Sequence, residues 1–506
     1  MEVLRTKSVE QSVRDTEEPD QGLRRSLGPI QLTGIGIGVI VGTGIFVLTG
    51  EAAGTLAGPA ISISFVAAGV VCLLAGLCYA EFASTVPAAG SAYTFSYASL
   101  GELVAWIIGW DLMLELAFGA ATVASGWAQY LQVVLTSAPW HAHPPAWVFA
   151  NHHNLAAALI VLALTALLCL GVSTSSRVNA VIVAIKLAII LLVIIAGLSY
   201  IHSGNYHPFI PPAGSKPAPG GSNETTLLQD LGAAPGAFGV GGIFSGAALV
   251  FFAFIGFDVV ATNAEETRRP QRHVPIGIFA SLAICAALYV AVSLVVTGMV
   301  KYNQINVAAP LATAFQSVHQ QTIAVIVAYG ALAGITSVIL VLLMGQSRVF
   351  FAMSRDRLLP PAFSAVSSRF GSPYRTTLVT GFVVAALGFF FPLKTLAELV
   401  NIGTLFAFIL VAIGVLVLRR SRPDLERPFR TPLVPLLPIV SVLASFWLML
   451  NLQGATWIRF GIWLVVGLVV YFGYSIRHSR LSEGETEAAP EQRPATVTPG
   501  RPRGSA

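Results

Sequence analysis

Long apolar runs separated by short polar segments make up most of this 506-residue sequence. A helix needs about 20 predominantly apolar residues to cross a membrane. Twelve runs come near that length, although the ninth is short: 30–50, 59–82, 102–135, 153–172, 177–201, 241–264, 275–300, 322–353, 376–391, 396–418, 434–452 and 457–475. The pattern predicts an all-α polytopic membrane protein with 12 transmembrane helices that contacts the lipid bilayer.

Composition and charge agree with this prediction. The chain is 55% hydrophobic and 10% charged, whereas a soluble domain carries about 25% charged residues. With the N-terminus in the cytosol, 24 of the 29 Lys and Arg fall in cytosolic segments, which leaves Lys186 inside a span and Lys216, Lys301, Lys394 and Arg459 in outer loops. This asymmetry predicts a plasma-membrane protein with both termini in the cytosol. The net charge of +5 gives no reason to expect a nucleic-acid partner.

The first apolar run contains five glycines between Gly34 and Gly44. Each glycine inside a helix costs about 1 kcal/mol relative to alanine. One interpretation is a glycine-lined surface for close helix packing. The other is a helix that stops near Gly42 and restarts at Ile45. Bare backbone inside a membrane persists only where it lines a cavity or is buried in protein.

The sixth apolar run carries a second interruption, because Gly256 and Asp258 lie near its middle. The first and sixth spans are five helices apart, so the second half of the chain would enter the membrane from the opposite face. Paired interruptions in two inverted halves are typical of the binding site of a secondary transporter. This pairing favours discontinuous helices 1 and 6 over a packing surface.

Two such interruptions would offer opposite charges to a ligand. The first N–H groups after Gly44 would lack helical partners and suit a carboxylate, with the Thr43 hydroxyl as an additional donor. The last carbonyls before the second interruption, those of Phe252, Ala253 and Ile255, would suit an ammonium group. Together the two ends match an α-amino acid.

Ionisable residues within the spans are candidates for coupling to ions. Lys186 would lie about 12 Å deep, where a lysine costs ~2.5–3.5 kcal/mol; it suits proton exchange, or it is a structural, paired lysine. Glu115 and Asp111 share one helical face. We expect Glu115 to be a partner of Lys186 or a proton acceptor, and Asp111 to be a hydrogen-bonded structural group. Asp258 either caps the restarted helix or faces the substrate path.

An ordered series of motifs covers most of the membrane region: Gly42-Thr-Gly-Ile-Phe46, Tyr79-Ala-Glu-Phe82, Pro87-Ala-Ala-Gly-Ser-Ala-Tyr93, Phe252-Ala-Phe-Ile-Gly-Phe-Asp258, Glu265-Glu-Thr-Arg268, Ala352-Met-Ser-Arg-Asp356 and Arg427-Pro-Phe-Arg-Thr-Pro432. With them the chain resembles the amino acid–polyamine–organocation (APC) superfamily, and more closely the bacterial members of the cationic amino acid transporter family. The first motif alone is weak, whereas the series is specific.

This resemblance implies a five-plus-five inverted repeat with two extra C-terminal helices and secondary transport of amino acids. The substrate-binding residues that it implies are Ile40, Gly42, Thr43 and Gly44 around the carboxylate, and Phe252, Ala253 and Ile255 around the amine. Leu342 would belong to the side-chain pocket, where a smaller residue would admit a long cationic chain. We therefore expect small or medium neutral amino acids, with cationic ones second.

The resemblance also implies proton coupling. Lys186 matches a lysine that, in proton-coupled members, occupies the position of a sodium ion in sodium-driven relatives. Glu115 and Tyr289 match polar positions near it. Sodium coupling is the alternative, since Thr336 and Ser337 could offer oxygens to an ion, but an ammonium at Lys186 would repel sodium. An exchanger that depends on neither gradient is also open.

The predicted organisation has six parts: a cytosolic tail (1–29), a first repeat (30–201), an extracytoplasmic loop (202–240), a second repeat (241–418), a cytosolic loop with two further helices (419–477) and a disordered cytosolic tail (478–506). An enzyme is not expected, because no HExxH, GxSxG or phosphate-loop motif is present. We expect no cofactor and no metal. A transporter-like amino acid sensor would use the same site, and an additional small membrane subunit would leave no sign in the sequence.

Overall fold

The computed structural model describes residues 27–85, 93, 96–97, 100–137, 140–150, 153–170, 176–218, 225–233, 236–262, 267–360 and 374–479. Most of the predicted N-terminal tail (1–26), almost all of the C-terminal tail (480–506) and parts of the motifs at 87–93 and 265–268 lie outside these residues.

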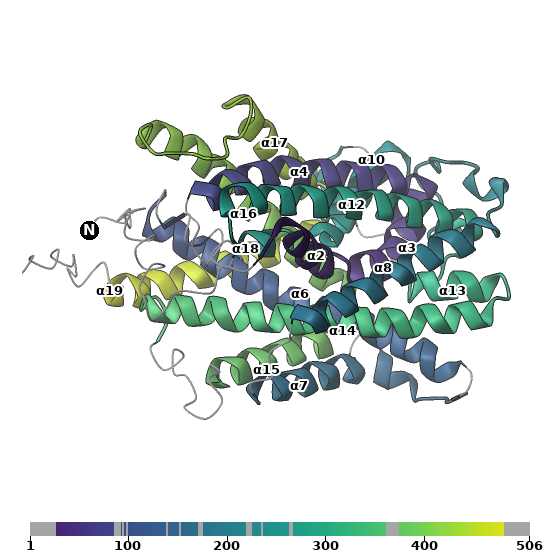
Figure 1. The fold of residues 1–506 in the computed structure, drawn as a ribbon. Helices are drawn as coiled ribbons and strands as arrows, with labels where there is room; N and C mark the ends of the chain where they lie inside the picture. The colour runs from purple at the N-terminus through teal and green to yellow at the C-terminus, as the bar shows by residue number, and fades with distance from the viewer. Residues whose placement is uncertain are drawn as a thin grey trace, which may run out of the picture.

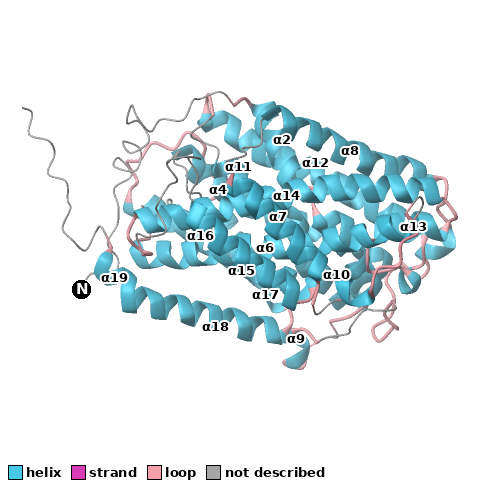
Figure 2. Cartoon of the chain, turned by 90° about the horizontal axis from the view of Figure 1, so that it is seen from below, coloured by secondary structure: helices cyan, strands magenta, loops and turns pink. Residues whose placement is uncertain are grey.

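The described residues form helices, with two isolated bridges and no β-strand among them (Figures 1 and 2). The α-helices are α2 (Pro29–Ile40), α3 (Thr49–Ala52), α4 (Ile61–Thr85), α6 (Glu102–Thr136), α7 (Leu155–Cys169), α8 (Ser176–Leu198), α9 (Leu227–Asp230), α10 (Gly239–Val250), α11 (Asp258–Thr262), α12 (Pro270–Met299), α13 (Pro310–Ser317), α14 (Gln321–Arg355), α15 (Tyr374–Phe390), α16 (Leu393–Ser421), α17 (Leu436–Leu450), α18 (Gly454–Val470) and α19 (Ile476–His478). Short π and 3₁₀ turns include η1 (Gly44–Leu48), η2 (Ala53–Ala57), η3 (Gly58–Ala60) and η6 (Phe251–Phe254).

Seven helical segments of the described chain are long and apolar enough to cross a membrane, and five shorter apolar helices accompany them. In chain order they coincide with the apolar runs of the sequence, and the segment Gly44–Thr85 joins the second half of the first run to the second run. The all-α class is therefore confirmed. Twelve membrane crossings and an inverted repeat stay predictions.

The longest helices, α6 and α14, each 35 residues, pack against one another along the centre of the bundle (Figure 1). α12 packs on α4 and α2, and α16 packs on α6 and α17. The short helix α2 therefore lies among longer helices, and its end is enclosed by protein.

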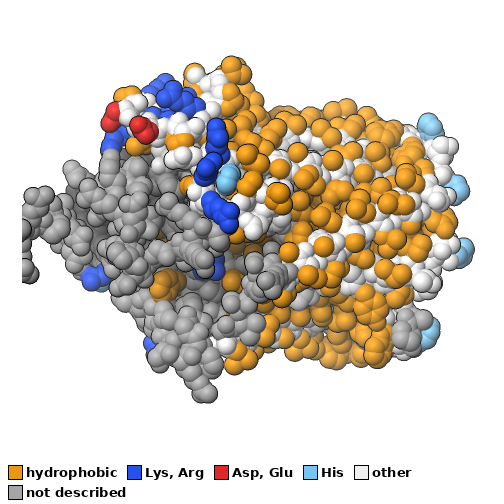
Figure 3. Space-filling model, viewed as in Figure 1, with side chains coloured by type: hydrophobic (Ala, Val, Ile, Leu, Met, Phe, Trp, Pro, Cys, Tyr) orange, Lys and Arg blue, Asp and Glu red, His pale blue; other side chains and the backbone are white. Residues whose placement is uncertain are grey.

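The surface in Figure 3 is a broad hydrophobic band, with Lys and Arg towards one end of the molecule and most of the visible His at the other. Such a band is expected of helices that face lipid, because no water is available there to solvate polar groups.

The end of α4 is held to the segment between α16 and α17 by a buried carboxylate. Glu81 accepts two hydrogen bonds from Arg419, at 2.9 and 2.8 Å, and one from the Thr431 amide at 2.8 Å. The Arg427 Nε lies 3.6 Å from the same carboxylate. Arg427 also donates to carbonyls of its own loop, those of Leu418 and Arg422 among them. We call this group the Glu81 clamp.

We expect Glu81→Gln to destabilise the protein, because two partly buried arginines lose their counter-charge; breaking a buried pair costs about 3 kcal/mol. The melting temperature of the purified protein in detergent should fall by several degrees. Glu426→Gln, at an exposed carboxylate of the same loop, is the matched control. Equal melting of the two variants would show that the Glu81 clamp contributes nothing.

Candidate functional site

The first interruption lies directly after α2. The helix ends at Ile40, Val41 is extended (φ −75°, ψ 95°), and helical structure resumes as the π-helical η1 at Gly44. The predicted break is confirmed. The helix ends two residues before Gly42 and restarts one residue before Ile45, so the predicted boundaries were slightly wrong.

The second interruption follows α10. The chain tightens into the 3₁₀ turn η6, becomes extended at Ile255 (φ −62°, ψ 138°) and restarts as α11 at Asp258. Gly256 has φ +111°, a conformation that residues with a side chain rarely adopt. Asp258 stands at the first residue of α11, as expected of a residue at the helix break.

The two interruptions touch one another. An added Cβ at Gly44 would overlap the backbone and side chain of Ala253. An added Cβ at Gly256 would overlap the side chain of Val39. The glycines at the breaks therefore permit close approach of two backbones, in addition to permitting a bend.

Side chains from neighbouring helices hydrogen-bond to carbonyls that the breaks release. The Lys186 Nζ, fully buried on α8, donates to the Gly38 carbonyl at 2.6 Å. The Tyr289 hydroxyl on α12 lies 2.9 Å from the Ile40 carbonyl and 3.0 Å from that of Ala253. Tyr289 thus joins the ends of both interrupted helices.

Two further side chains, which the sequence analysis missed, act in the same way. The Tyr130 hydroxyl on α6 donates to the Phe46 carbonyl at 2.7 Å. The Asn401 amide on α16 donates to the carbonyls of Ala248 and Leu249 at 2.7 and 3.0 Å. A polar residue such as Asn401 within an apolar run was the available signal.

Two of the three carbonyls predicted to accept an amine, those of Phe252 and Ala253, have different hydrogen-bond partners. The Phe252 carbonyl accepts from the Ile255 amide at 3.3 Å, and that of Ala253 faces Tyr289. Each carbonyl has two lone pairs, so both can accept a second hydrogen bond. On the opposite side, the Thr43 hydroxyl donates to the Val123 carbonyl at a long 3.4 Å, a bond that a stronger acceptor can replace.

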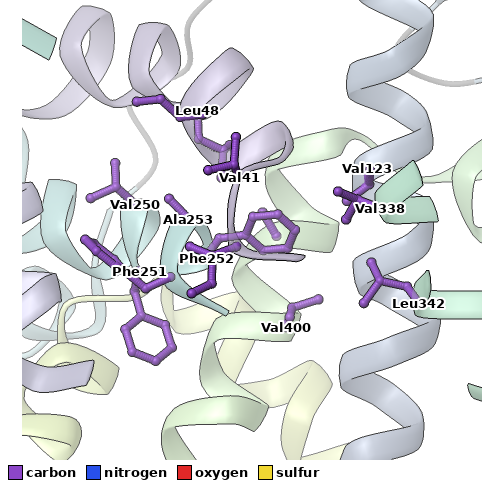
Figure 4. Close-up of a cluster of buried hydrophobic side chains, with 14 of the residues drawn as sticks. Val41, Leu48, Val123, Val250, Phe251, Phe252, Ala253, Val338, Leu342 and Val400 are labelled. Atoms are coloured by element: carbon purple, nitrogen blue, oxygen red, sulfur yellow. The ribbon is translucent and has the colours of Figure 1, made fainter. Parts of the chain in front are cut away.

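A small cavity of about 20 Å³ lies between the interruptions and the helices α6, α14 and α16. Its lining contains most of the predicted substrate residues, together with aliphatic side chains: Val39, Ile40, Gly42, Thr43, Gly44, Glu115, Gly119, Val123, Phe252, Ile255, Val338, Leu342 and Val400. Figure 4 shows the Phe252 ring facing Val123 and Val338, with Leu342 and Val400 nearby. The volume suffices for about one water molecule, so Phe252 or its neighbours must move to admit a larger ligand.

Some of the predicted site residues line this cavity, and others lie outside its lining. Ala253, Lys186, Tyr289 and Asp258 are not part of the lining. The lining residues that sequence reasoning missed follow helical spacing: Gly119 and Val123 continue the face of Glu115 on α6, and Val338 lies one turn before Leu342 on α14.

Of the two alternatives for Glu115, a partner of Lys186 was wrong and a proton acceptor stays a prediction; the expectation of a hydrogen-bonded Asp111 was wrong. Glu115 lines the cavity and forms no ion pair with Lys186, whose described partner is the Gly38 carbonyl. Asp111 is fully buried, but neither of its carboxylate oxygens has a hydrogen-bond partner. Sequence depth placed these residues correctly, but it did not show which way each side chain points.

Comparison with known proteins decides the family. The profile described as "Amino acid permease" matches residues 27–473. The chain belongs to this family. The resemblance to the APC superfamily is thereby confirmed, and this permease is an integral membrane transporter, not an enzyme.

Several relatives are similar over nearly the whole permease. It is 45% identical to the methylthioribose transporter of Bacillus subtilis (strain 168) over 92% of this chain and 97% of that protein. It is also 45% identical to the branched-chain amino acid permease BcaP of the same organism, over 95% and 99%. Identity to the vacuolar cationic amino acid transporter 2 of Arabidopsis thaliana is 37%, over 84% and 64%.

The contact between the two interruptions leads to a direct test in this permease. Gly44→Ala forces a methyl group into Ala253, and such overpacking costs about 1–3 kcal/mol. Gly34→Ala on α2 is the matched control, because nothing lies within 4 Å of an added Cβ there. We expect the melting temperature to fall for Gly44→Ala alone. If both variants melt like the wild type, the two backbones do not approach as closely as described.

Proposed function

We propose that this permease is a secondary transporter that takes up neutral aliphatic amino acids together with protons, by alternating access across the cell membrane, with both termini in the cytosol. The observation that carries the proposal is the pair of interrupted helices facing one small cavity. The start of η1 presents N–H groups to an anion, and the end of η6 presents carbonyls to a cation. The charged groups of an α-amino acid fit between them.

The walls of the cavity support a neutral, aliphatic substrate side chain. Val123, Val338, Leu342 and Val400 offer only hydrocarbon, which favours an apolar group by about 25 cal/mol for each Å² that it buries. A relative named for branched-chain amino acids, 45% identical along almost its full length, agrees with this choice.

Cationic amino acids are the second candidate, because Glu115 also lines the cavity. An ionised Glu115 would attract a cationic side chain, provided that the cavity expanded past Leu342. A methylthioribose-like sugar is a weaker candidate, since it would leave the two charged backbone ends without matching groups.

The position of Lys186 supports proton coupling, because this side chain on α8 contacts both α2 and α14. Its ammonium group binds the Gly38 carbonyl at the end of α2, and its stem packs where Gly334 of α14 leaves room. Loss of the proton would exchange a charged hydrogen bond for a neutral one, and charge-assisted bonds are about twice as strong. Protonation would thus change how firmly α2 is held to α8.

Uptake into proteoliposomes tests the proposed function. We expect labelled leucine to accumulate under an inward proton gradient and not under a sodium gradient alone, with excess isoleucine competing and excess arginine or methylthioribose competing poorly. Lys186→Met should lose the response to the proton gradient.

Other outcomes would replace parts of the proposal. Sodium-driven uptake would contradict proton coupling, and counterflow indifferent to both gradients and to Lys186→Met would indicate an exchanger. Leucine binding without movement would indicate a sensor, whereas uptake of arginine or methylthioribose in preference to leucine would contradict the substrate class.

A further inference from the structure

Asp111 is an unpaired carboxylate in the middle of the bundle. It lies on α6, one helical turn before Glu115, and its side chain is fully buried. Neither Oδ1 nor Oδ2 has a hydrogen-bond partner among the residues that the structure describes. An added Cβ at Gly403 of α16 would lie 2.6 Å from Oδ1, so the glycine makes room for the carboxyl group without offering it a donor.

The groups around Asp111 are acids and hydroxyls. Glu115, on the same helix, interacts electrostatically with both Asp111 and Asp258 of α11. The Tyr79 ring on α4 interacts with all three carboxylates. The buried side chain of Thr404, next to Gly403, lies beside the Glu115 carboxyl group.

No ion pair involves Asp111 or Glu115 among the residues that the structure describes. Lys186 binds the Gly38 carbonyl instead, and the described ion pairs both involve Glu81.

An ionised Asp111 in this position would be costly. A charged aspartate at the centre of a membrane costs ~2.5–3.5 kcal/mol even on insertion scales, where relaxation is included. A protonated carboxyl group avoids that cost. A metal ion is a poor alternative, because no group of three possible ligands is found in the described part of the chain.

Asp111 lies between the cavity and one end of the molecule. Glu115 lines the cavity, and Asp111 lies about 6 Å further along α6, towards the Glu102 end of the helix. Asp111 is therefore a titratable group on the same helical face as Glu115, one turn nearer that end of the molecule.

We propose that Asp111 is a proton-binding site, which holds a proton in the closed conformation and exchanges it with Glu115 or with water when the Glu102 end of the bundle opens. The reaction is a simple proton transfer between carboxyl groups or to water. This inference rests on the proposed function, because Asp111 would be a second proton site, besides Lys186, of a proton-coupled transporter.

Infrared spectroscopy tests the protonation directly. At neutral pH we expect the wild type to show the C=O stretching band of a buried, protonated carboxyl group, and Asp111→Asn to lose it. Glu81→Gln is the matched control, since Glu81 is another buried carboxylate, whose oxygens accept hydrogen bonds from Arg419, and its replacement should leave the band unchanged. An unchanged spectrum in Asp111→Asn would overturn the proposal.

Transport assays test the role of that proton. For Asp111→Asn and Asp111→Leu, we expect the ratio of proton-driven leucine uptake to leucine counterflow to fall about fivefold or more, the range of typical coupling energies. Neither variant removes a protein hydrogen bond, so both should fold. Glu398→Gln, at another buried carboxylate, bonded by Thr456, should keep the wild-type ratio. A wild-type ratio in both Asp111 variants would overturn the proposal, whereas a wild type without leucine counterflow would instead overturn the proposed function.

Discussion

A backbone carbonyl released within a membrane must find a new hydrogen-bond partner, because the lipid offers none. This permease has such carbonyls at two places, near the end of α2 and from the end of α10 through η6, and side chains of the surrounding helices donate hydrogen bonds to them. Lys186, Tyr289 and Asn401 come from α8, α12 and α16. The interrupted helices are therefore held by their neighbours, and the cavity between them is a consequence of that arrangement.

The same arrangement connects the substrate site with coupling. Tyr289 contacts the ends of both interrupted helices, and Lys186 holds the end of one of them. A ligand ammonium group bound to the Ala253 carbonyl would share that carbonyl with Tyr289, so its arrival would change the surroundings of the Tyr289 hydroxyl. The proposed proton site at Asp111 lies on α6, one helical turn from Glu115. Glu115 itself lines the cavity.

The helix breaks could be predicted from the sequence, whereas most of the hydrogen bonds to their carbonyls could not. Gly42 and Gly44 alone fitted a packing surface as well as a helix break. The second interruption at Gly256 and Asp258, five helices later, favoured the break. The partner of Lys186 could not be foreseen, since the Gly38 carbonyl becomes available only when the helix stops at Ile40. The pairing of Glu115 with Lys186 was wrong because the depth of a residue can be estimated from the sequence, whereas the direction of its side chain depends on how α6 packs.

A structure of the permease with leucine, determined by electron cryomicroscopy in a lipid nanodisc, tests the central claim most directly. We predict that the leucine carboxylate lies at Thr43 and Gly44, that its ammonium faces the carbonyls between Phe252 and Ile255, and that Phe252 moves to enlarge the cavity. Leucine bound elsewhere, or a helix that runs unbroken through residues 40–46, would contradict the account.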